Sequence, residues 1–505
     1  MSLEEDKISA IDVDVEAVSA EKEFGETVNV KKNFTARLAS MFDVETRGIE
    51  RVLPEDRTDT SLVTACTMWL SSNLVIAALS TGALSTAAFG LGWYDSVAII
   101  IIFTLIGALP VALYSVLCAK FGLRQMILTR FLAGNFGARI YSVLNIISCV
   151  GWGAINVIPA VELLHMVNDQ KLPPWAGCLI LVVITALIAL LGYDYIHVYE
   201  KYSWIPNFII FLILIARLHI NGEFYNAPMG IGESEISGAI TYASLVFGFA
   251  AGWVPSCGDY VIYKSPSIPG WKIFVAVYTG IVFPCLFSLL LGAACGTGVQ
   301  TNERLLELWN DSSVGGLIYG ILVENSLHGF GQFCCVILGL STIANNLPSS
   351  YSVSICAQAV SPLSAKIPRI VWCFVGNFVM LGICIPAYYV FEEAMENFLD
   401  MISYFVSIYI GGTMAEHFVF RKGKEDSYNP EDCDNFYKLP LGIAGTFAFC
   451  CGIAGAVLGM SETWYVGPIA KHIGSYGGDI GWELCIAFTF IGHCVARPFE
   501  LKYFG

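Results

Sequence analysis

Long apolar segments recur along the chain and are separated by short polar segments. A helix that spans a lipid bilayer needs about 20 mostly apolar residues, because lipid offers no hydrogen bonds to the backbone. Eight segments meet this criterion clearly: 97–118, 140–167, 175–192, 204–220, 274–295, 370–390, 441–460 and 480–495. Four weaker segments, interrupted by small and polar residues, are 63–89, 236–263, 329–359 and 398–420. The pattern therefore predicts an all-α membrane protein with about twelve transmembrane helices.

Composition agrees with this class and argues against several others. Apolar residues make up 56% of the chain and charged residues 14%, and the mean hydropathy is +0.65. The formal net charge of −15 does not suggest nucleic-acid binding. The 17 cysteines lie mostly singly in apolar segments, without the paired spacing of a zinc site, and the histidines are scattered. We therefore expect neither an enzyme nor a protein that holds a metal ion or a cofactor.

Lysine and arginine residues near the predicted spans set the orientation, because cytoplasmic loops retain them. With both termini in the cytoplasm, the inner segments hold Lys120, Arg124, Arg130, Arg139, Lys201, Lys264, Lys272, Lys366, Arg369, Arg421, Lys422, Lys424, Lys438, Arg497 and Lys502. The outer loops hold only Lys171, Arg217, Arg304 and Lys471. The asymmetry supports the twelve-span topology independently of hydropathy.

This topology divides the chain into four parts. Residues 1–60 are polar and acidic, which predicts a disordered cytoplasmic tail. Residues 61–420 would form helices 1–10, and residues 421–498 the last two helices with the inner loop before them. Residues 499–505 would form a short cytoplasmic tail. The oligomeric state does not follow from the sequence.

Two of the weaker spans contain signals for a broken helix. The first span carries Gly82 within a run of small and hydroxyl residues, and the sixth carries Gly252 and Pro255. Small residues in one span more often permit close helix packing. Matching interruptions five spans apart instead indicate two inverted five-helix repeats, whose broken helices form a transport site near the membrane midplane.

The third span places an indole and an amide on one helix face, because Trp152 and Asn156 are four residues apart. A flat heterocycle needs such a pair: a ring to stack on and an amide to bond its edge. Trp152 alone would more simply be a packing residue. A buried Asn within a span is more costly and more often faces a partner or a cavity.

The eighth span contains the most unusual segment, with the adjacent amides of Asn345 and Asn346 followed by Pro348 and Ser349. Adjacent amides project to different faces of a helix, and the proline lacks a backbone donor. Packing of helices would not need both amides, so a binding or ion-gating role with a break at Pro348 is favoured.

Two carboxyl groups in the spans are further candidates for proton coupling or gating. Glu162 lies two turns outward of Trp152 on the third span. Asp259 lies near the inner end of the sixth span, where it is expected to cap or gate.

Several stretches together resemble the nucleobase cation symporter type 1 family, and within it the fungal purine-cytosine permeases. They are RGIERV (47–52), GWGAIN (151–156), YEKYSWIPN (199–207), AGW (251–253), SCGDY (256–260) and ANNLP (344–348). The resemblance covers the chain from about Arg47 to the C-terminus. It implies a LeuT-type fold of five plus five inverted helices with two added, working by alternating access.

The resemblance also implies the substrate and the site. Cytosine and purines such as adenine, guanine and hypoxanthine would enter across the plasma membrane together with a proton. The base would stack between Trp152 and Trp253, with Ser80 nearby. Its polar edge would meet Asn156 and the segment from Asn345 to Ser349.

Glu200, in the YEKY stretch, is the carboxyl that the resemblance suggests for proton coupling. A plain interfacial ion pair with Lys201 is an equal alternative.

The eighth span departs from the pattern of related permeases, which usually read Asn-Asn-x-Pro-Asn, because Ser349 follows Pro348 here. A serine has a shorter reach and no bidentate amide edge, which leaves the substrate preference open. A permease of the same fold for pyridoxine or another flat heterocycle is one alternative. A non-transporting nutrient sensor is a second, although the inner loops are short and offer no signalling domain.

Overall fold

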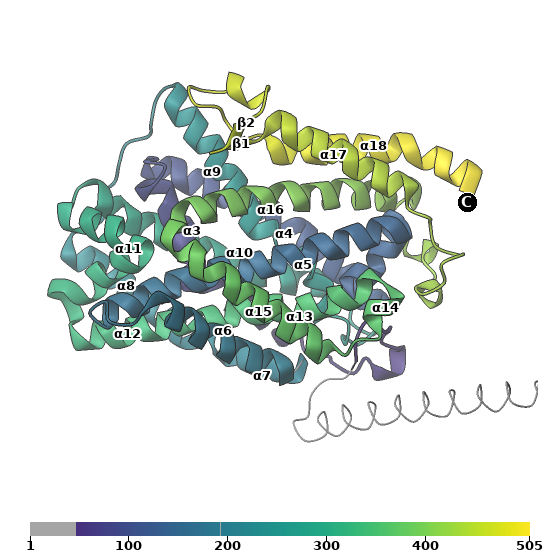
Figure 1. Cartoon of the computed structure of the whole chain (residues 1–505), viewed down its shortest axis with the longest axis horizontal. Helices are drawn as coiled ribbons and strands as arrows, with labels where there is room; N and C mark the ends of the chain where they lie inside the picture. The colour runs from purple at the N-terminus through teal and green to yellow at the C-terminus, as the bar shows by residue number, and fades with distance from the viewer. Residues whose placement is uncertain (1–46, 192, 505) are drawn as a thin grey trace, which may run out of the picture.

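The computed structural model describes residues 47–191 and 193–504, so residues 1–46 of the predicted tail lie outside the described residues. Long helices run side by side along the molecule (Figure 1). The first half contains α2 (Leu62–Asn73), α3 (Ile76–Ala87), α4 (Trp93–Phe121), α5 (Gln125–Val167), α6 (Pro174–Leu191), α7 (Tyr193–Tyr202), α8 (Trp204–Asn221) and α9 (Glu233–Ala251).

The second half continues in the same way, with one small hairpin. Its helices are α10 (Gly270–Gly296), α11 (Glu303–Leu322), α12 (Gly329–Leu340), α13 (Thr342–Val360), α14 (Pro362–Ala365), α15 (Arg369–Ala387), α16 (Phe391–Met414), α17 (Ile443–Gly459) and α18 (Gly481–Phe504). The strands β1 (Ser461–Glu462) and β2 (Tyr465–Val466) pair antiparallel between α17 and α18.

The described helices have the lengths and apolar surfaces of membrane spans. Seven are long and apolar enough to cross a bilayer, and the bent pair α2 and α3 makes an eighth. The candidate span Arg369–Phe420 contains both α15 and α16, and the shorter helices α6 and α17 are also apolar. Large apolar side chains such as Phe378, Ile147 and Ile491 are more than half exposed, as expected for a lipid-facing surface. The count of twelve spans stays a prediction.

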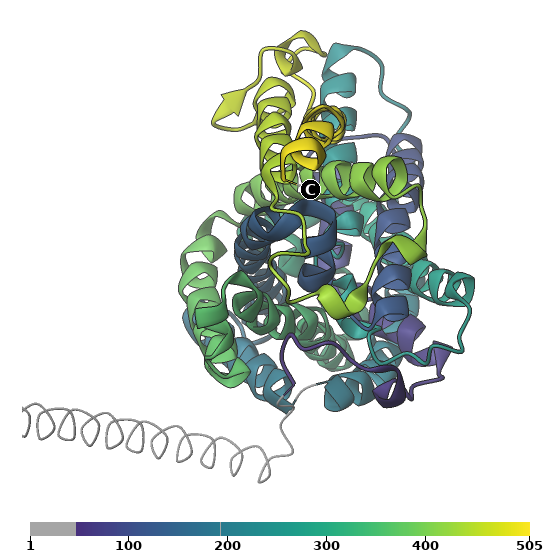
Figure 2. The same ribbon diagram turned by 90° about the vertical axis from the view of Figure 1, so that its right-hand side faces the viewer.

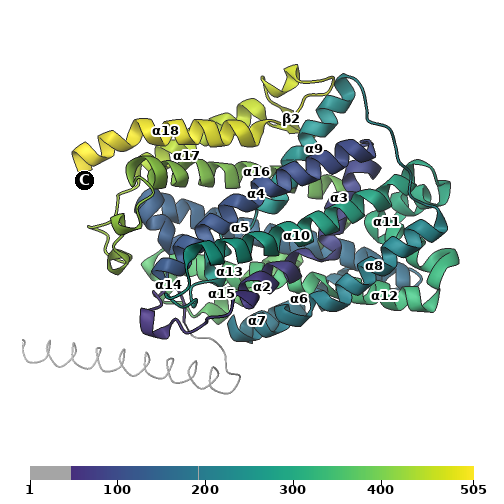
Figure 3. The same cartoon turned by 180° about the vertical axis from the view of Figure 1, so that it is seen from behind.

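Helix α5 runs along the middle of the bundle and contacts α11, α13, α15 and α16 (Figure 1). From behind, α10 lies across α2, α3 and α4 (Figure 3). Helices α17 and α18 pack on each other and on α16 along one edge (Figure 2). The end of the bundle that holds the C-terminus is here called the terminal end. The hairpin β1–β2 lies at the end of α17 and α18 that is away from the C-terminus (Figures 1 and 3).

The first broken helix does not break at Gly82. Helix α2 ends at Asn73 and α3 begins at Ile76, with a bend of 51° between them. Gly82 lies inside α3, where an added Cβ would lie 2.0 Å from the carbonyl oxygen of Leu289 on α10. This glycine therefore permits close packing of two helices, which is the alternative use of a small residue in a membrane.

The other interruptions are also located by the structure. Gly252, Trp253 and Pro255 lie between α9 and the short 3₁₀ turn η2 (Cys257–Tyr260), outside any α-helix. Pro348 does not break its helix, because α13 runs through it. Helices α12 and α13 meet at Ser341, whose backbone keeps right-handed helical angles, so together they form one candidate span, Gly329–Val360. The carbonyl of Pro348 accepts a hydrogen bond of 2.6 Å from the hydroxyl of Tyr260.

Candidate functional site

The break between α2 and α3 is held open by side chains of the α12–α13 segment. In a continuous helix the N–H of Ile76 would donate to the carbonyl of Ser72. Instead this N–H donates to the Ser341 hydroxyl at 3.1 Å. The Ser72 carbonyl accepts from the amide of Asn345 at 2.6 Å. Both halves of the missing backbone bond are therefore satisfied by another span, which is what an unwound segment inside a membrane requires.

Three amide side chains meet beside this break and form what we call the amide cluster, Asn156, Asn345 and Asn346. The Nδ2 of Asn156 donates to the Oδ1 of Asn345 and, at 3.3 Å, to that of Asn346. The Nδ2 of Asn346 donates to the carbonyl of Gly153 at 3.0 Å. All three residues are at most 2% exposed. The predicted amides of the third and eighth spans thus meet in the interior and do not face lipid.

The interruption between α9 and η2, here called the second break, is joined to the first break through Trp253. The indole Nε1 of Trp253 donates to the Oδ1 of Asn73, the last residue of α2, at 3.0 Å. Its ring also packs against Trp69, with centroids 5.3 Å apart. The carbonyl of Asn73 accepts from the hydroxyl of Ser288 on α10 at 3.1 Å. The two unwound segments are therefore linked to each other and anchored on α10.

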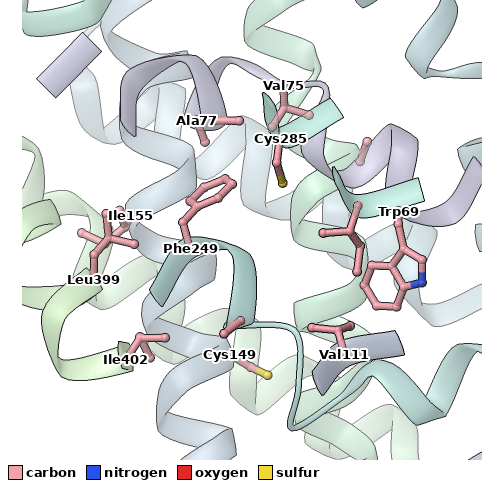
Figure 4. Close-up of a cluster of buried hydrophobic side chains, with 14 of the residues drawn as sticks. Trp69, Val75, Ala77, Val111, Cys149, Ile155, Phe249, Cys285, Leu399 and Ile402 are labelled. Carbon is pink, nitrogen blue, oxygen red and sulfur yellow. The ribbon is translucent and has the colours of Figure 1, made fainter. Parts of the chain in front are cut away.

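Trp152 lies against the start of the second break. An added Cβ on Gly252 would lie 2.9 Å from the Cζ2 of Trp152, so only a glycine leaves room for the indole. The ring meets Phe249 and Phe398 edge-on, with centroid distances of 5.7 Å and 5.3 Å. In Figure 4, Phe249 points from α9 toward Ala77 of α3. Trp152 thus has aromatic neighbours from two helices, α9 and α16, and lies against Gly252, the residue before Trp253.

The two predicted serines differ in how they relate to the amide cluster. Ser349 is buried on α13 and shares a helix face with Asn345 and Asn346, which lie one turn earlier. Ser80 is buried on α3, but its hydroxyl donates to the carbonyl of Ile76 in its own helix at 3.1 Å. A role for Ser80 in binding would require that this bond be exchanged.

Glu200 is fully buried, and this does not match an ion pair at the membrane surface. Among the described residues, neither of its carboxyl oxygens accepts a hydrogen bond of good geometry, and the donor that acts on it is the hydroxyl of Ser71. Lys201 is exposed, with its ammonium 5.3 Å from the centroid of the Tyr202 ring. Glu200 lies near Ser71 of α2, the helix that leads into the first break. A buried carboxyl beside a broken helix is well placed to carry a proton.

The other two predicted carboxyls have different surroundings. Glu162 is buried against α11, where a Cβ added to Gly315 would lie 2.5 Å from the Cβ of Glu162. Asp259 accepts the backbone N–H of Gln125 at 3.0 Å, so it caps the first turn of α5. The hydroxyl of Ser352 on α13 also donates to it, at 3.4 Å. Asp259 therefore ties three elements together.

Residues 47–61, here called the N-terminal cover, lie on the terminal end of the bundle, so residues 47–60 of the predicted disordered tail are ordered, with a 3₁₀ turn at Pro54–Asp56. Asp59 forms an ion pair of 2.6 Å with Lys264, whose side chain is fully buried. Burial acts to raise the pKa of Asp59, but the bonds from Lys264 outweigh it and hold this pKa below its ordinary value. Arg57 donates to the carbonyls of Ala119 and Lys120, both at 2.8 Å. The cover is therefore fastened to the end of α4 and to the segment after η2.

Sequence reasoning missed several residues of this site, namely Trp69, Asn73, Ser72, Ser341, Asp59 and Lys264. A polar residue in the first apolar segment was the available signal for Asn73. Lys264 had been counted only as a basic residue of an inner loop. Its burial follows from tertiary contacts that hydropathy does not describe.

Comparison with known proteins places the chain. A family model described as permease for cytosine/purines, uracil, thiamine, allantoin matches residues 52–481. The chain belongs to this family. It is 46% identical over 502 residues to the purine-cytosine permease FCY22 of Saccharomyces cerevisiae, covering 99% of this chain and 94% of the relative. It is 28% identical to the vitamin B6 transporter TPN1 of the same species, with coverages of 92% and 88%.

Solved structures of the same fold support the architecture. Mhp1, a nucleobase-cation-symport-1 family transporter solved in a closed conformation with bromovinylhydantoin bound, superposes with a TM-score of 0.66 at 14% identity. The match covers 91% of this chain and 95% of Mhp1. MhsT, solved with L-phenylalanine, gives a TM-score of 0.53 at 12% identity, covering 87% of this chain and 98% of MhsT. The LeuT-type fold expected from the sequence is confirmed, and the chain is a multi-pass membrane permease.

Proposed function

We propose that this permease imports cytosine and the purine bases adenine, guanine and hypoxanthine by proton symport through alternating access. The observation that carries the proposal is the amide cluster, buried where the two broken helices meet and adjacent to Trp152. An amide offers a donor and an acceptor side by side, which matches the edge of a nucleobase. Trp152 supplies a ring surface on which a flat base can stack.

The expected affinity follows from these groups. Stacking of a base on an aromatic ring is worth about 1–3 kcal/mol. Together with a few hydrogen bonds from the amide cluster, it reaches the free energy near −8 kcal/mol that corresponds to micromolar binding. For a bound base, Asn156 would exchange one of its bonds to Asn345 or Asn346 for a bond to the substrate. We propose Trp253 as the second stacking surface, with its present bond to Asn73 released.

Glu200 is the proposed coupling group. Its buried carboxyl avoids an unpaired charge when it carries a proton, and Ser71 connects it to the broken span. In the proposed orientation both termini lie in the cytoplasm and the permease resides in the plasma membrane. The N-terminal cover would then close the cytoplasmic end of the pathway.

The direct test is initial uptake of labelled cytosine and hypoxanthine by cells that lack their own nucleobase permeases. We expect saturable uptake that increases at acidic external pH and falls on addition of a protonophore. A protein that reaches the plasma membrane but gives no uptake of any base would support the nutrient-sensor alternative. An uptake rate that does not change on addition of the protonophore would contradict proton symport.

A pyridoxine permease is the second candidate, because the chain is 28% identical to a vitamin B6 transporter. The higher identity to a purine-cytosine permease favours nucleobases. Competition separates the two. For a nucleobase permease, unlabelled adenine suppresses uptake of labelled cytosine and an equal concentration of pyridoxine does not.

A further inference from the structure

A group of buried carboxyls lies at the hairpin β1–β2, away from the terminal end. Asp400 belongs to α16, Glu462 to strand β1, and Asp479 to the segment just before α18. They are 1%, 5% and 0% exposed. We call these three residues the carboxyl cluster. Segments far apart in the sequence thus bring three buried acidic groups within electrostatic reach of one another. The hairpin and the start of α18 lie side by side (Figures 1 and 3).

Asp479 is the only member of the carboxyl cluster with a full set of donors among the described residues. It accepts the backbone N–H of Ser461 at 2.7 Å and that of Gly481 at 3.0 Å. The hydroxyl of Tyr404 also donates to it. These bonds suit an ionised carboxylate. Asp479 therefore accounts for one negative charge within the carboxyl cluster.

Asp400 and Glu462 have fewer donors than Asp479. Among the described residues the Ser244 hydroxyl acts on Asp400 and the Tyr404 hydroxyl on Glu462, but neither forms a hydrogen bond of good geometry with these carboxyls. Both carboxyls face Asp479, and Asp400 also faces Glu462. Buried like charges with so few donors favour a bound proton over further negative charge. Two members of the carboxyl cluster therefore have a place for a proton.

Among the described residues, the charged groups that act most strongly on the carboxyl cluster are all acidic. The charged groups that face the carboxyl cluster are further carboxyls, Glu396 of α16 and Glu483 of α18, and α9 contributes the hydroxyl of Ser244. Within the described residues no group of acidic, thiol or imidazole side chains is arranged to hold a metal ion. A proton is the ligand that this chemistry fits.

Glu462 and Asp479 lie outside the spans, between α17 and α18, and their titration agrees with the geometry. Burial raises the pKa of Glu462 to about 8, and the nearby charge of Asp479 adds to this effect. Burial also raises the pKa of Asp479. Both pKa values are raised in the buried arrangement of the carboxyl cluster. The stability of that arrangement is therefore complete at low pH and is lost as the pH rises through the raised pKa values.

The carboxyl cluster is directly connected to the candidate substrate site through α16. Phe398, two residues before Asp400, packs edge-on against Trp152. The hydroxyl of Ser403 on α16 bonds to that of Ser244 on α9 at 2.9 Å. An added Cβ on Gly248 would lie 2.6 Å from the carbonyl oxygen of Leu399, so α16 and α9 are in close contact here. Anything that separates α16 from α9 would also uncover Trp152.

We propose that the carboxyl cluster is a proton-binding site whose occupancy allows the outer end of α16 to close over the substrate. The proposal rests on the proton symport proposed above and assigns a second proton site in addition to Glu200. When protons leave at high external pH, the negative charges repel one another and attract water, so α16 moves away from α9. At low external pH the protonated carboxyl cluster lets the outer end close.

The test compares initial uptake of labelled cytosine at external pH 4.5 and 7.5 for the parental permease and the Asp400→Asn variant. An asparagine cannot ionise, so closing of this variant requires one proton fewer. A requirement for one proton changes the closing equilibrium by up to tenfold per pH unit. We expect the ratio of uptake at the two pH values to fall at least threefold in D400N, while KM at pH 4.5 stays unchanged.

A control is Glu303→Gln, because Glu303 is an exposed carboxyl on another helix, α11. We expect E303Q to keep the parental pH ratio. The Glu462→Gln variant tests the same site from the hairpin, and it decides the outcome if D400N does not reach the cell surface. Parental pH ratios in every variant of the carboxyl cluster that reaches the surface would overturn the proposal.

The design separates this inference from the function on which it rests. A parental protein whose uptake is insensitive to a protonophore contradicts proton symport itself. A parental protein with protonophore-sensitive uptake, together with unchanged pH ratios in D400N and E462Q, contradicts only the proton site at the carboxyl cluster.

Discussion

Replacement of Asn156 by alanine is the sharpest test of the substrate site. The change removes the Nδ2 that donates to Asn345 and Asn346, and leaves two buried amide oxygens short of a donor. The other bonds of these residues, to the carbonyls of Ser72 and Gly153, remain. The broken helix should therefore keep its support while the amide cluster loses its central donor.

The magnitude follows from the cost of a missing buried hydrogen bond, which is about 1–3 kcal/mol. If Asn156 bonds the base, this free energy is lost from binding, and the apparent affinity falls by roughly 5- to 150-fold. The assay is the concentration dependence of cytosine uptake, corrected for the amount of permease at the cell surface. We expect a rise in KM within that range.

Asn377→Ala is a matched control. Asn377 is also a buried amide of a span, 4% exposed on α15, and it bonds to Ser350 of α13 and to the carbonyl of Cys373. Its removal should lower the amount of folded protein without a change in KM. A normal KM in Asn156→Ala, or an equal rise in both variants, would refute the proposed role of the amide cluster.

Three further outcomes test other parts of the structure. Trp152→Ala should weaken binding by the stacking free energy of about 1–3 kcal/mol, seen as a raised KM, whereas Trp152→Phe should restore much of it. Asp59→Asn should leave Lys264 buried without its counter-charge and lower the free energy of unfolding by about 3 kcal/mol in thermal melts of purified protein. Because the pKa of Asp59 is lowered, the stabilisation by the ion pair should be complete at neutral pH and lost as the pH falls through that pKa. Glu500→Ala removes the carboxylate that accepts three backbone N–H groups at the start of α17, so the melting temperature should fall by an amount equivalent to about 1–2 kcal/mol while KM stays unchanged.

The fold could be predicted from the sequence because the bilayer imposes a simple rule on it. Apolar length locates helices such as α4 and α10 with little ambiguity. Paired interruptions in the first and sixth spans indicated the inverted repeats, and the LeuT-type fold bears this out. The polar spans were the least regular in hydropathy, and these contain the broken helices.

The positions of the breaks could not be predicted as well, because they depend on partners from other spans. Gly82 and Pro348 are the residues that local conformational preference selects, yet both lie inside helices. The first break lies at Leu74 and Val75, two apolar residues without any intrinsic tendency to end a helix. The side chains of Ser341, Asn345 and Ser288, which are remote in sequence, bind the backbone groups that the break leaves free.

The same dependence explains how the site can be both stable and mobile. Each unwound segment is stabilised by groups of a different span: the first by Ser341 and Asn345, and the second by the bond from Trp253 to Asn73. A base that accepts a hydrogen bond from Asn345 would compete with the carbonyl of Ser72, to which Asn345 donates now. A base that accepts one from Trp253 would compete with the side chain of Asn73. In the proposed site, binding of substrate would therefore act on the same bonds that fix the two broken helices relative to each other. In this arrangement a small ligand can change the free energy of a large rearrangement, because its differential contacts are made at the hinge itself.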